Sequence, residues 1–209
     1  MIILQSPMIR LTSLLAALVV LLFSATEGVS ADIKKGGAAY QRGDCRTALR
    51  EWKPLAEEGD PAAQSGMGLL YENGCGVPQN YRAALIWHRL AATAGLAGAQ
   101  YNLALMCLEE GTPCDDTEAA KWLRLASEQG LHPAQANLAV LYAYGDGVPQ
   151  DYIISYMWAG LAASMGHVLA ERLVEEHLTK RMSLEDILIA TSLAKICLRT
   201  SYKQCGYPE

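Results

Sequence analysis

Ser192 and Lys195 are the residues whose types and spacing come nearest to a catalytic pattern. They match S-x-x-K, in which a lysine one helical turn from a serine supports the nucleophile of penicillin-recognising enzymes. The companion S-D-N and K-T-G sequences of those enzymes are absent from the chain. Both residues also fall in a segment with the apolar spacing of an amphipathic helix. The pattern therefore favours an ordinary serine and a solvated lysine over a hydrolase site.

The histidines do not have the spacing of metal ligands. They are His88, His132, His167 and His177. No two stand four residues apart, and the H-E-x-x-H sequence is missing. Two glycine-rich segments, Gly74–Gly76 and Gly145–Gly147, lack the lysine of a phosphate-binding loop. We therefore expect no metal, no cofactor and no catalytic residue, and a protein that is not an enzyme.

The first residues have the order of a secretory signal. Arg10 precedes an unbroken apolar run, Leu14–Phe23, and small residues follow up to Val29-Ser30-Ala31. The run is shorter than the roughly 20 residues that span a bilayer comfortably, although an uncleaved anchor is the alternative. We predict a signal peptide over residues 1–31 and a periplasmic or secreted mature chain that begins at Asp32 and leaves the membrane.

Six cysteines follow this segment, and none stands in a CxxC spacing. They are Cys45, Cys75, Cys107, Cys114, Cys197 and Cys205. An even number of cysteines in an exported chain predicts disulfides. Cys197 and Cys205 lie at a helix end and in the loop after it, and Cys107 and Cys114 flank a turn, which leaves Cys45 for Cys75. Six cysteines allow many other pairings, so spacing alone leaves the connectivity open.

The composition limits the classes of protein to which this chain can belong. Hydrophobic residues make up 51% and charged residues 19% of the 209, which argues against disorder and allows a sizeable core. The net charge of −5 is spread without long runs of one sign and gives no basic footprint for nucleic acid.

The elements that must position these residues repeat every 35 or 36 residues. The tryptophans in phase are Trp52, Trp87, Trp122 and Trp158, and the glycines in phase are Gly59, Gly95, Gly130 and Gly166. The pair Ala-Gln recurs on the same beat at Ala63, Ala99 and Ala134. Three markers in phase over more than a hundred residues indicate a helical repeat array.

Each unit has the pattern of two helices. The first helix is predicted from Pro61 to Asn73, with equivalents that begin at Ala97 and Pro133. Gly74 and Gly145 can end a helix in the left-handed conformation, and a proline four residues later prevents its continuation. The residues predicted to cap the second helices are Asn80, Asp115 and Asp151.

The second helices carry the tryptophans. The apolar stripes predicted for two of them are Ala84, Trp87, Leu90, Ala91 and Ala94, and Ala119, Trp122, Leu125 and Ala126. In the first helices Gly68 shares its position with Ala104 and Ala139. A glycine there allows a close approach, and we expect a neighbouring tryptophan to fill the space beside it.

Because no unit can bury its stripe alone, we predict an all-α fold, an α-solenoid of antiparallel helix pairs. Residues 32–60 form a degenerate capping repeat, and three repeats follow over 61–96, 97–131 and 132–166. Residues 167–209 form C-terminal capping helices and a tail, in which Ser183 and Asp186 make a capping box. The predicted buried face of the last helix is Ile187, Ala190, Leu193, Ala194 and Cys197.

The Ala-Gln start, the Tyr-x-x-Gly-x-Gly-Val turn, the Asp/Asn-Tyr helix entry and the Trp…Ala-Ala…Gly exit resemble the Sel-one-like repeat (SLR) family, relatives of the tetratricopeptide repeats. The resemblance covers about Ala38 to Gly166. The unit at 97–131 departs from it, because Cys107–Cys114 is one residue short and lacks the first glycine. The resemblance implies a superhelical scaffold with a concave binding surface and a protein or peptide partner, with no particular ligand.

In related solenoids the first helices line the concave side. The residues there that avoid the tryptophan stripe are Tyr101, Asn102, Leu105 and Leu108, then Ala136, Asn137, Val140 and Tyr144. Leu69, Leu105 and Val140 align as an apolar row, and the two asparagines could hold a peptide backbone through their amides. The alternative is that several of these residues merely pack between units.

The leading expectation is thus an exported scaffold, a monomer, that binds its partner through this face. Some cysteine-rich relatives are described as binding or hydrolysing β-lactams. A small cell-envelope hydrolase is therefore the alternative, and a structural protein without a dedicated partner is a third.

Overall fold

The computed structural model describes residues 31–206, so the predicted signal peptide lies outside the described residues except for its last residue. The first helices of successive pairs are α2 (Ile33–Gln41), α4 (Pro61–Asn73), α6 (Ala97–Cys107) and α8 (His132–Tyr144). The second helices are α3 (Cys45–Glu57), α5 (Tyr81–Thr93), α7 (Asp116–Ser127) and α9 (Tyr152–Ser164). The chain then forms α10 (Val168–Arg172), the π-helical η1 (Leu173–Leu178) and α11 (Leu184–Arg199).

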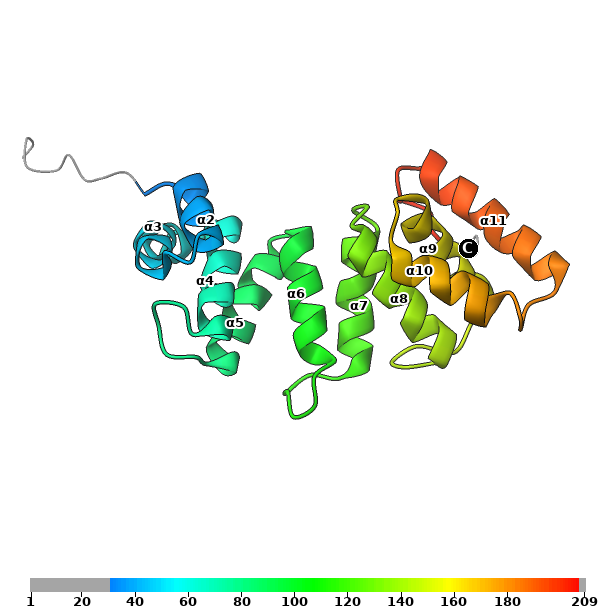
Figure 1. Cartoon of the computed structure of the whole chain (residues 1–209), viewed down its shortest axis with the longest axis horizontal. Helices are drawn as coiled ribbons and strands as arrows, with labels where there is room; N and C mark the ends of the chain where they lie inside the picture. The colour runs from blue at the N-terminus through cyan, green and yellow to red at the C-terminus, as the bar shows by residue number, and fades with distance from the viewer. Residues whose placement is uncertain (1–30, 207–209) are drawn as a thin grey trace, which may run out of the picture. The chain divides into compact units, whose positions relative to one another are not determined.

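Each helix from α2 to α9 packs against the next along the chain, and Figure 1 shows them following one another in chain order. Residues 31–206 contain no strand. The prediction of an all-α solenoid of helix pairs is therefore confirmed. The pairs α4–α5, α6–α7 and α8–α9 are called the first, second and third repeats below.

Local chemistry sets the helix ends where the sequence indicates. Gly74 and Gly145 end α4 and α8 at φ of +64° and +82°, a conformation that costs glycine little. The side chains of Asn80, Asp115 and Asp151 accept hydrogen bonds from free backbone N–H groups at the starts of α5, α7 and α9. The predicted caps are confirmed at all three positions.

The glutamine of each Ala-Gln pair holds one repeat to the previous one. Gln64, Gln100 and Gln135 are buried. The side-chain Nε2 of each donates a hydrogen bond to the backbone carbonyl oxygen eight residues earlier, with N–O distances of 3.4, 3.2 and 3.2 Å. That carbonyl lies in the last turn of the preceding second helix and also accepts from the backbone N–H of the glycine three residues later, Gly59, Gly95 or Gly130. The glutamine therefore adds a second hydrogen bond at the helix end and joins the start of one repeat to the end of the previous one.

The predicted tryptophan stripe of the second helices is partly wrong. Leu90 and Leu125 are 45% and 43% exposed, and Ala94 is exposed as well. The buried residues of α5 are Ala84, Leu85, His88, Ala91 and Ala92, and those of α7 are Ala119, Ala120, Leu123, Ala126 and Ser127. The buried face is turned toward the residue after each tryptophan, because alanines allow neighbouring helices to approach closely on that side.

The expectation that a tryptophan fills the space beside Gly68 is also wrong. The imidazole of His88 lies there, so that a Cβ at Gly68 would stand 2.6 Å from its ring atoms. Trp52 instead lies between two other glycines, Gly36 of α2 and Gly66 of α4. His88 is completely buried, and its Nε2 lies 3.4 Å from a carboxylate oxygen of Glu72 without hydrogen-bond geometry.

The C-terminal helices close the array. The predicted capping box of Ser183 and Asp186 starts α11, which packs against α9. Ala190, Leu193 and Cys197 are buried on α11, as predicted, and Ile187 and Ala194 are half-buried. Trp158 of α9 is fully buried, unlike Trp87 and Trp122. No helix within residues 31–206 has both the length and the apolar character to cross a membrane.

Three disulfides join the cysteines in the pairs favoured by the spacing. Cys45–Cys75 links the start of α3 to the turn after α4, with 5.1 Å between the Cα atoms. Cys107–Cys114 closes the short turn between α6 and α7, and Cys197–Cys205 ties the end of α11 to the tail. The first disulfide joins two units, and the other two act within one.

Candidate interaction surface

The predicted binding residues divide between α6 and α8. Tyr101, Asn102 and Leu105 are half-buried on α6, and on α8 Val140 and Tyr144 are 37% and 55% exposed. The predicted row of apolar side chains, formed by Leu105 and Val140 with Leu69 of α4, is partly accessible in all three repeats.

Tyr101 and Asn137 meet across the junction between the second and third repeats. The amide nitrogen of Asn137 donates to the Tyr101 hydroxyl at 3.3 Å and to the backbone carbonyl of Pro133 at 3.1 Å. Both amide hydrogens are therefore used inside the protein, and the amide oxygen remains to accept from a peptide N–H. Ala136 was expected on this face but is buried, because it packs into the core beside Leu138.

Tyr144 forms an aromatic group that the sequence did not reveal. Its ring lies 5.1 Å from the imidazole of His177 in η1, and Tyr152 lies 6.3 Å from the same imidazole. Burial, and secondarily the charge of Arg181, lowers the pKa of His177, which favours the neutral ring that packs against the two tyrosines. A π-helical turn places His177 here, and no sequence spacing predicts such a turn.

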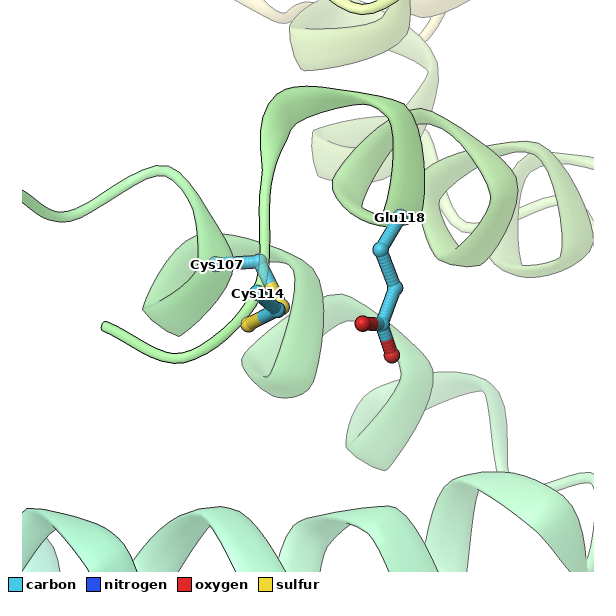
Figure 2. A group of neighbouring side chains, drawn as sticks. All are labelled: Cys107, Cys114 and Glu118. Atoms are coloured by element: carbon cyan, nitrogen blue, oxygen red, sulfur yellow. A yellow bond between two sulfur atoms is a disulfide. The ribbon is translucent and has the colours of Figure 1, made fainter.

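Glu118 lies beside the disulfide of the second repeat, as Figure 2 shows, with donor atoms of Cys107, Cys114 and Glu118 within 4.8 Å of one another. Both sulfurs are committed to the disulfide. One carboxylate oxygen of Glu118 accepts from Arg89 Nη1 and from Trp122 Nε1 at 3.2 Å, and the Arg89 bond is the main cause of a lowered pKa for Glu118. These partners give the cluster a structural role between α5 and α7.

Ser192 and Lys195 both lie on the exposed side of α11. The hydroxyl of Ser192 donates to the carbonyl of Leu188 at 2.8 Å, an ordinary bond of a serine within a helix. Within the described residues no interaction joins the two side chains, so the geometry does not assemble the nucleophile and base of an acyl-transfer site.

Comparison with known proteins agrees with the architecture. The Sel1 repeat family profile matches residues 61–96, 97–131 and 132–167. A search of curated proteins found no match.

Two solved structures are similar to this chain, each at 33% sequence identity. One is a protective antigen present in uropathogenic Escherichia coli strains, which displays an SLR fold; the TM-score is 0.69, and the match covers 83% of this chain and 39% of that one. The other is a Sel1 repeat protein from Oxalobacter formigenes, with a TM-score of 0.56 and coverage of 62% of this chain and 98% of that one. This chain thus spans only 39% of the length of the Escherichia coli protein.

Proposed function

The chain belongs to the Sel1 repeat family, and from that premise we propose that it is an exported scaffold that binds a protein or peptide partner. Sel1 repeat proteins are helical scaffolds that typically mediate protein–protein interaction. We further propose a binding face on α6 and α8, an exported location and the lack of an enzymatic activity.

The binding face we propose is formed by Tyr101, Asn102 and Leu105 of α6 with Asn137, Val140 and Tyr144 of α8. The observation that carries it is the apolar row shared with Leu69, which stays partly accessible in three successive repeats. An extended or helical peptide could bury that row, which is the main source of affinity in such grooves. Tyr144 adds a large exposed aromatic surface, a residue type enriched among binding hot spots.

The cysteines support an exported location, periplasmic or secreted. All six are joined in disulfides, which persist in oxidising compartments and are rare in the cytosol. The signal-like segment before Asp32 agrees with this proposal. Edman sequencing of the protein from its native host should begin at Asp32, and alkylation without reduction should label no cysteine.

A binding function is favoured over catalysis because Ser192 and Lys195 point to solvent without a partner that would activate the serine. The proposal expects no turnover of a chromogenic β-lactam by protein purified free of contaminating enzymes. Turnover that disappears in Ser192→Ala would contradict it.

Site-specific photo-crosslinking tests the face directly. A photoreactive amino acid at Tyr144 should capture one defined partner in the native cell, because this side chain is 55% exposed on the proposed face. The matched control is Ile86, which is 59% exposed on the second helix α5. A photoreactive amino acid at Ile86 should not capture the partner that is captured from Tyr144. With the crosslinker placed at Val140, the double substitution Tyr101→Ala/Tyr144→Ala should remove the product and leave the circular dichroism spectrum unchanged. The same product from Ile86, or capture that survives the double substitution, would rule out this face.

A further inference from the structure

Two arginines stand at the same place in successive repeats, and their surroundings differ. Arg89 follows Trp87 by two residues, and Arg124 follows Trp122 by two residues. The position four residues before the tryptophan of the following repeat is Glu118 for Arg89 and Ile154 for Arg124. The repeat therefore supplies a carboxylate to the first arginine and an isoleucine to the second.

At the first junction the arginine is paired. A guanidinium nitrogen of Arg89 donates to a carboxylate oxygen of Glu118, and the same oxygen accepts from Trp122. The Arg89–Glu118 contact shows that an arginine at this position of the repeat can bind a carboxylate.

At the second junction no carboxylate takes the place of Glu118, although Glu128, one turn later at the end of α7, lies near enough to interact with the charge of Arg124. Arg124 donates to the hydroxyl of Tyr142, and its guanidinium carbon lies 5.8 Å from the centre of that ring. Within residues 31–206 the structure shows no ion pair between Arg124 and a carboxylate. A guanidinium has five N–H donors, so most of those of Arg124 remain available for a ligand.

Arg124 lines a cleft of about 940 Å³, the upper end of the range typical of ligand sites. Ile154 of α9 and Ile196 of α11 give it apolar walls, and the tail from Lys203 to Gly206 forms another side. The Cys197–Cys205 disulfide fixes that tail. The cleft is thus bounded by elements that the fold holds in place.

The charges of the cleft favour a single carboxylate as the ligand group. The lining holds two cations, Arg124 and Lys203, and two acidic residues, Glu128 and Asp151, so its formal charges cancel and a single negative charge is opposed less than the two of a phosphate dianion. Burial raises the pKa of Glu128 and Arg124 opposes this, which indicates that the site is partly shielded from water. A carboxylate matches the planar fork of a guanidinium and can accept two parallel bonds from it.

We propose that the cleft beside Arg124 binds a peptide carboxylate, either a chain-terminal group or an aspartate or glutamate side chain, which takes the place that Glu118 occupies at the preceding junction. The site is separate from the face on α6 and α8. Tyr142 is two residues from both Val140 and Tyr144, so it projects from roughly the opposite side of α8. An experiment can therefore disprove one of the two sites without disproving the other.

Calorimetric or NMR titration of the full mature chain tests the proposal with three probes. These are N-acetyl-trialanine with a free terminal carboxylate, the same peptide as its C-terminal amide, and an amidated N-acetyl tripeptide with a central aspartate. We expect either acidic peptide to bind and the neutral amide to bind at least about tenfold more weakly, the usual effect of losing a hydrogen-bonded charge. Binding of the terminal acid alone identifies a chain end as the ligand, and binding of the central aspartate identifies a side chain. Equal binding of all three peptides, or binding of none, would overturn the proposal.

Two variants and two controls assign the effect to the cleft. Arg124→Gln should weaken binding of the acidic probe at least about tenfold while keeping a donor for Tyr142. Arg89→Gln removes the equivalent arginine of the first repeat and should leave binding unchanged. Tyr101→Ala/Tyr144→Ala should also leave it unchanged, which separates this site from the proposed face. Retained binding by Arg124→Gln would overturn the proposal.

The substitution Ile154→Glu is a more stringent test of the proposal, because it gives Arg124 the internal carboxylate that Arg89 already has. The introduced glutamate should occupy the guanidinium and exclude the acidic probe. Ile154 is 6% exposed, so folding of this variant is checked by circular dichroism before titration. A folded variant that binds the probe as tightly as the parent would show that Arg124 is not the anchor.

Discussion

The first and second repeats have equivalent positions, but different side chains fill the space between their two helices. In the first, Gly68 faces the ring of buried His88. In the second, the same two positions hold Ala104 and Leu123, both fully buried. A larger side chain on one helix is thus matched by a smaller one on the other, so the repeat conserves the space between two helices and not the residues that fill it.

The connections to neighbouring helices differ in the same way. The arginine of the first repeat, Arg89, reaches Glu118 of the second, whereas Arg124 faces Ile154 and a cleft. The turn of the first repeat is linked by Cys75 to the preceding unit, whereas the disulfide of the second closes only its own turn. The first repeat is therefore bound to its neighbours by covalent and ionic contacts, and the second leaves a group available for a ligand.

The largest expected difference between the two repeats lies in their disulfides. Cys45–Cys75 spans 30 residues and Cys107–Cys114 spans 7. Because loop-closure entropy grows with loop length, Cys45→Ala/Cys75→Ala should cost about 3 to 4 kcal/mol of unfolding free energy, and Cys107→Ala/Cys114→Ala about 2 to 3 kcal/mol. Guanidinium unfolding followed by circular dichroism measures both. A greater loss from the short loop would contradict this ranking.

The next effect concerns the packing at Gly68. A Cβ there would stand 2.6 Å from the buried His88 ring, so Gly68→Ala should destabilise the protein by about 1 to 3 kcal/mol despite the better helix propensity of alanine. The double variant Gly68→Ala/His88→Leu reproduces the pair found in the second repeat and should recover most of that loss.

A double-mutant cycle of thermal unfolding midpoints tests this compensation. Residues in contact should show a coupling energy of about 0.5 kcal/mol or more. Simple additivity of the two substitutions would mean that the two positions do not share one space.

The same comparison explains what the sequence could predict. The period, the turns at Gly74 and Gly145 and the caps of α5, α7 and α9 depend on residues within one or two turns of a helix, so local patterns were sufficient. The stripe through Leu90 and Leu125 was wrong because the pattern weighs large apolar residues, whereas alanines form the closely packed side of these helices.

The interaction sites could not be predicted in the same way, because they depend on contacts between residues that are distant in the sequence. Tyr144 meets His177 through a π-helical turn 33 residues later, and no periodicity in the sequence indicates that turn. The missing counterpart of Glu118 beside Arg124 did leave a signal, since aligning the repeats places Ile154 where Glu118 stands. The alignment alone could not show that a cleft opens beside the arginine, because the tail and α11 that bound it lie outside the repeat.

The smallest expected effect is the ion pair of the first repeat. Arg89 and Glu118 are 40% and 28% exposed, so solvent screening limits their contribution to below about 1 kcal/mol. The pKa of Glu118 is lowered from 4.5, first by the Arg89 hydrogen bond, so the contribution is complete above the unfolded-state pKa and is lost as the pH falls through the lower folded-state value. Glu118→Gln should therefore reduce unfolding free energy at pH 7, and the difference from the parent should shrink as the solution is acidified below about pH 4.5. Urea unfolding at a series of pH values measures it, with Arg82→Gln on the same helix α5 as the matched control, because Arg82 is exposed and takes part in none of the ion pairs of residues 31–206. A Glu118→Gln difference that stayed constant into acid would mean that the carboxylate charge contributes nothing to joining α5 and α7.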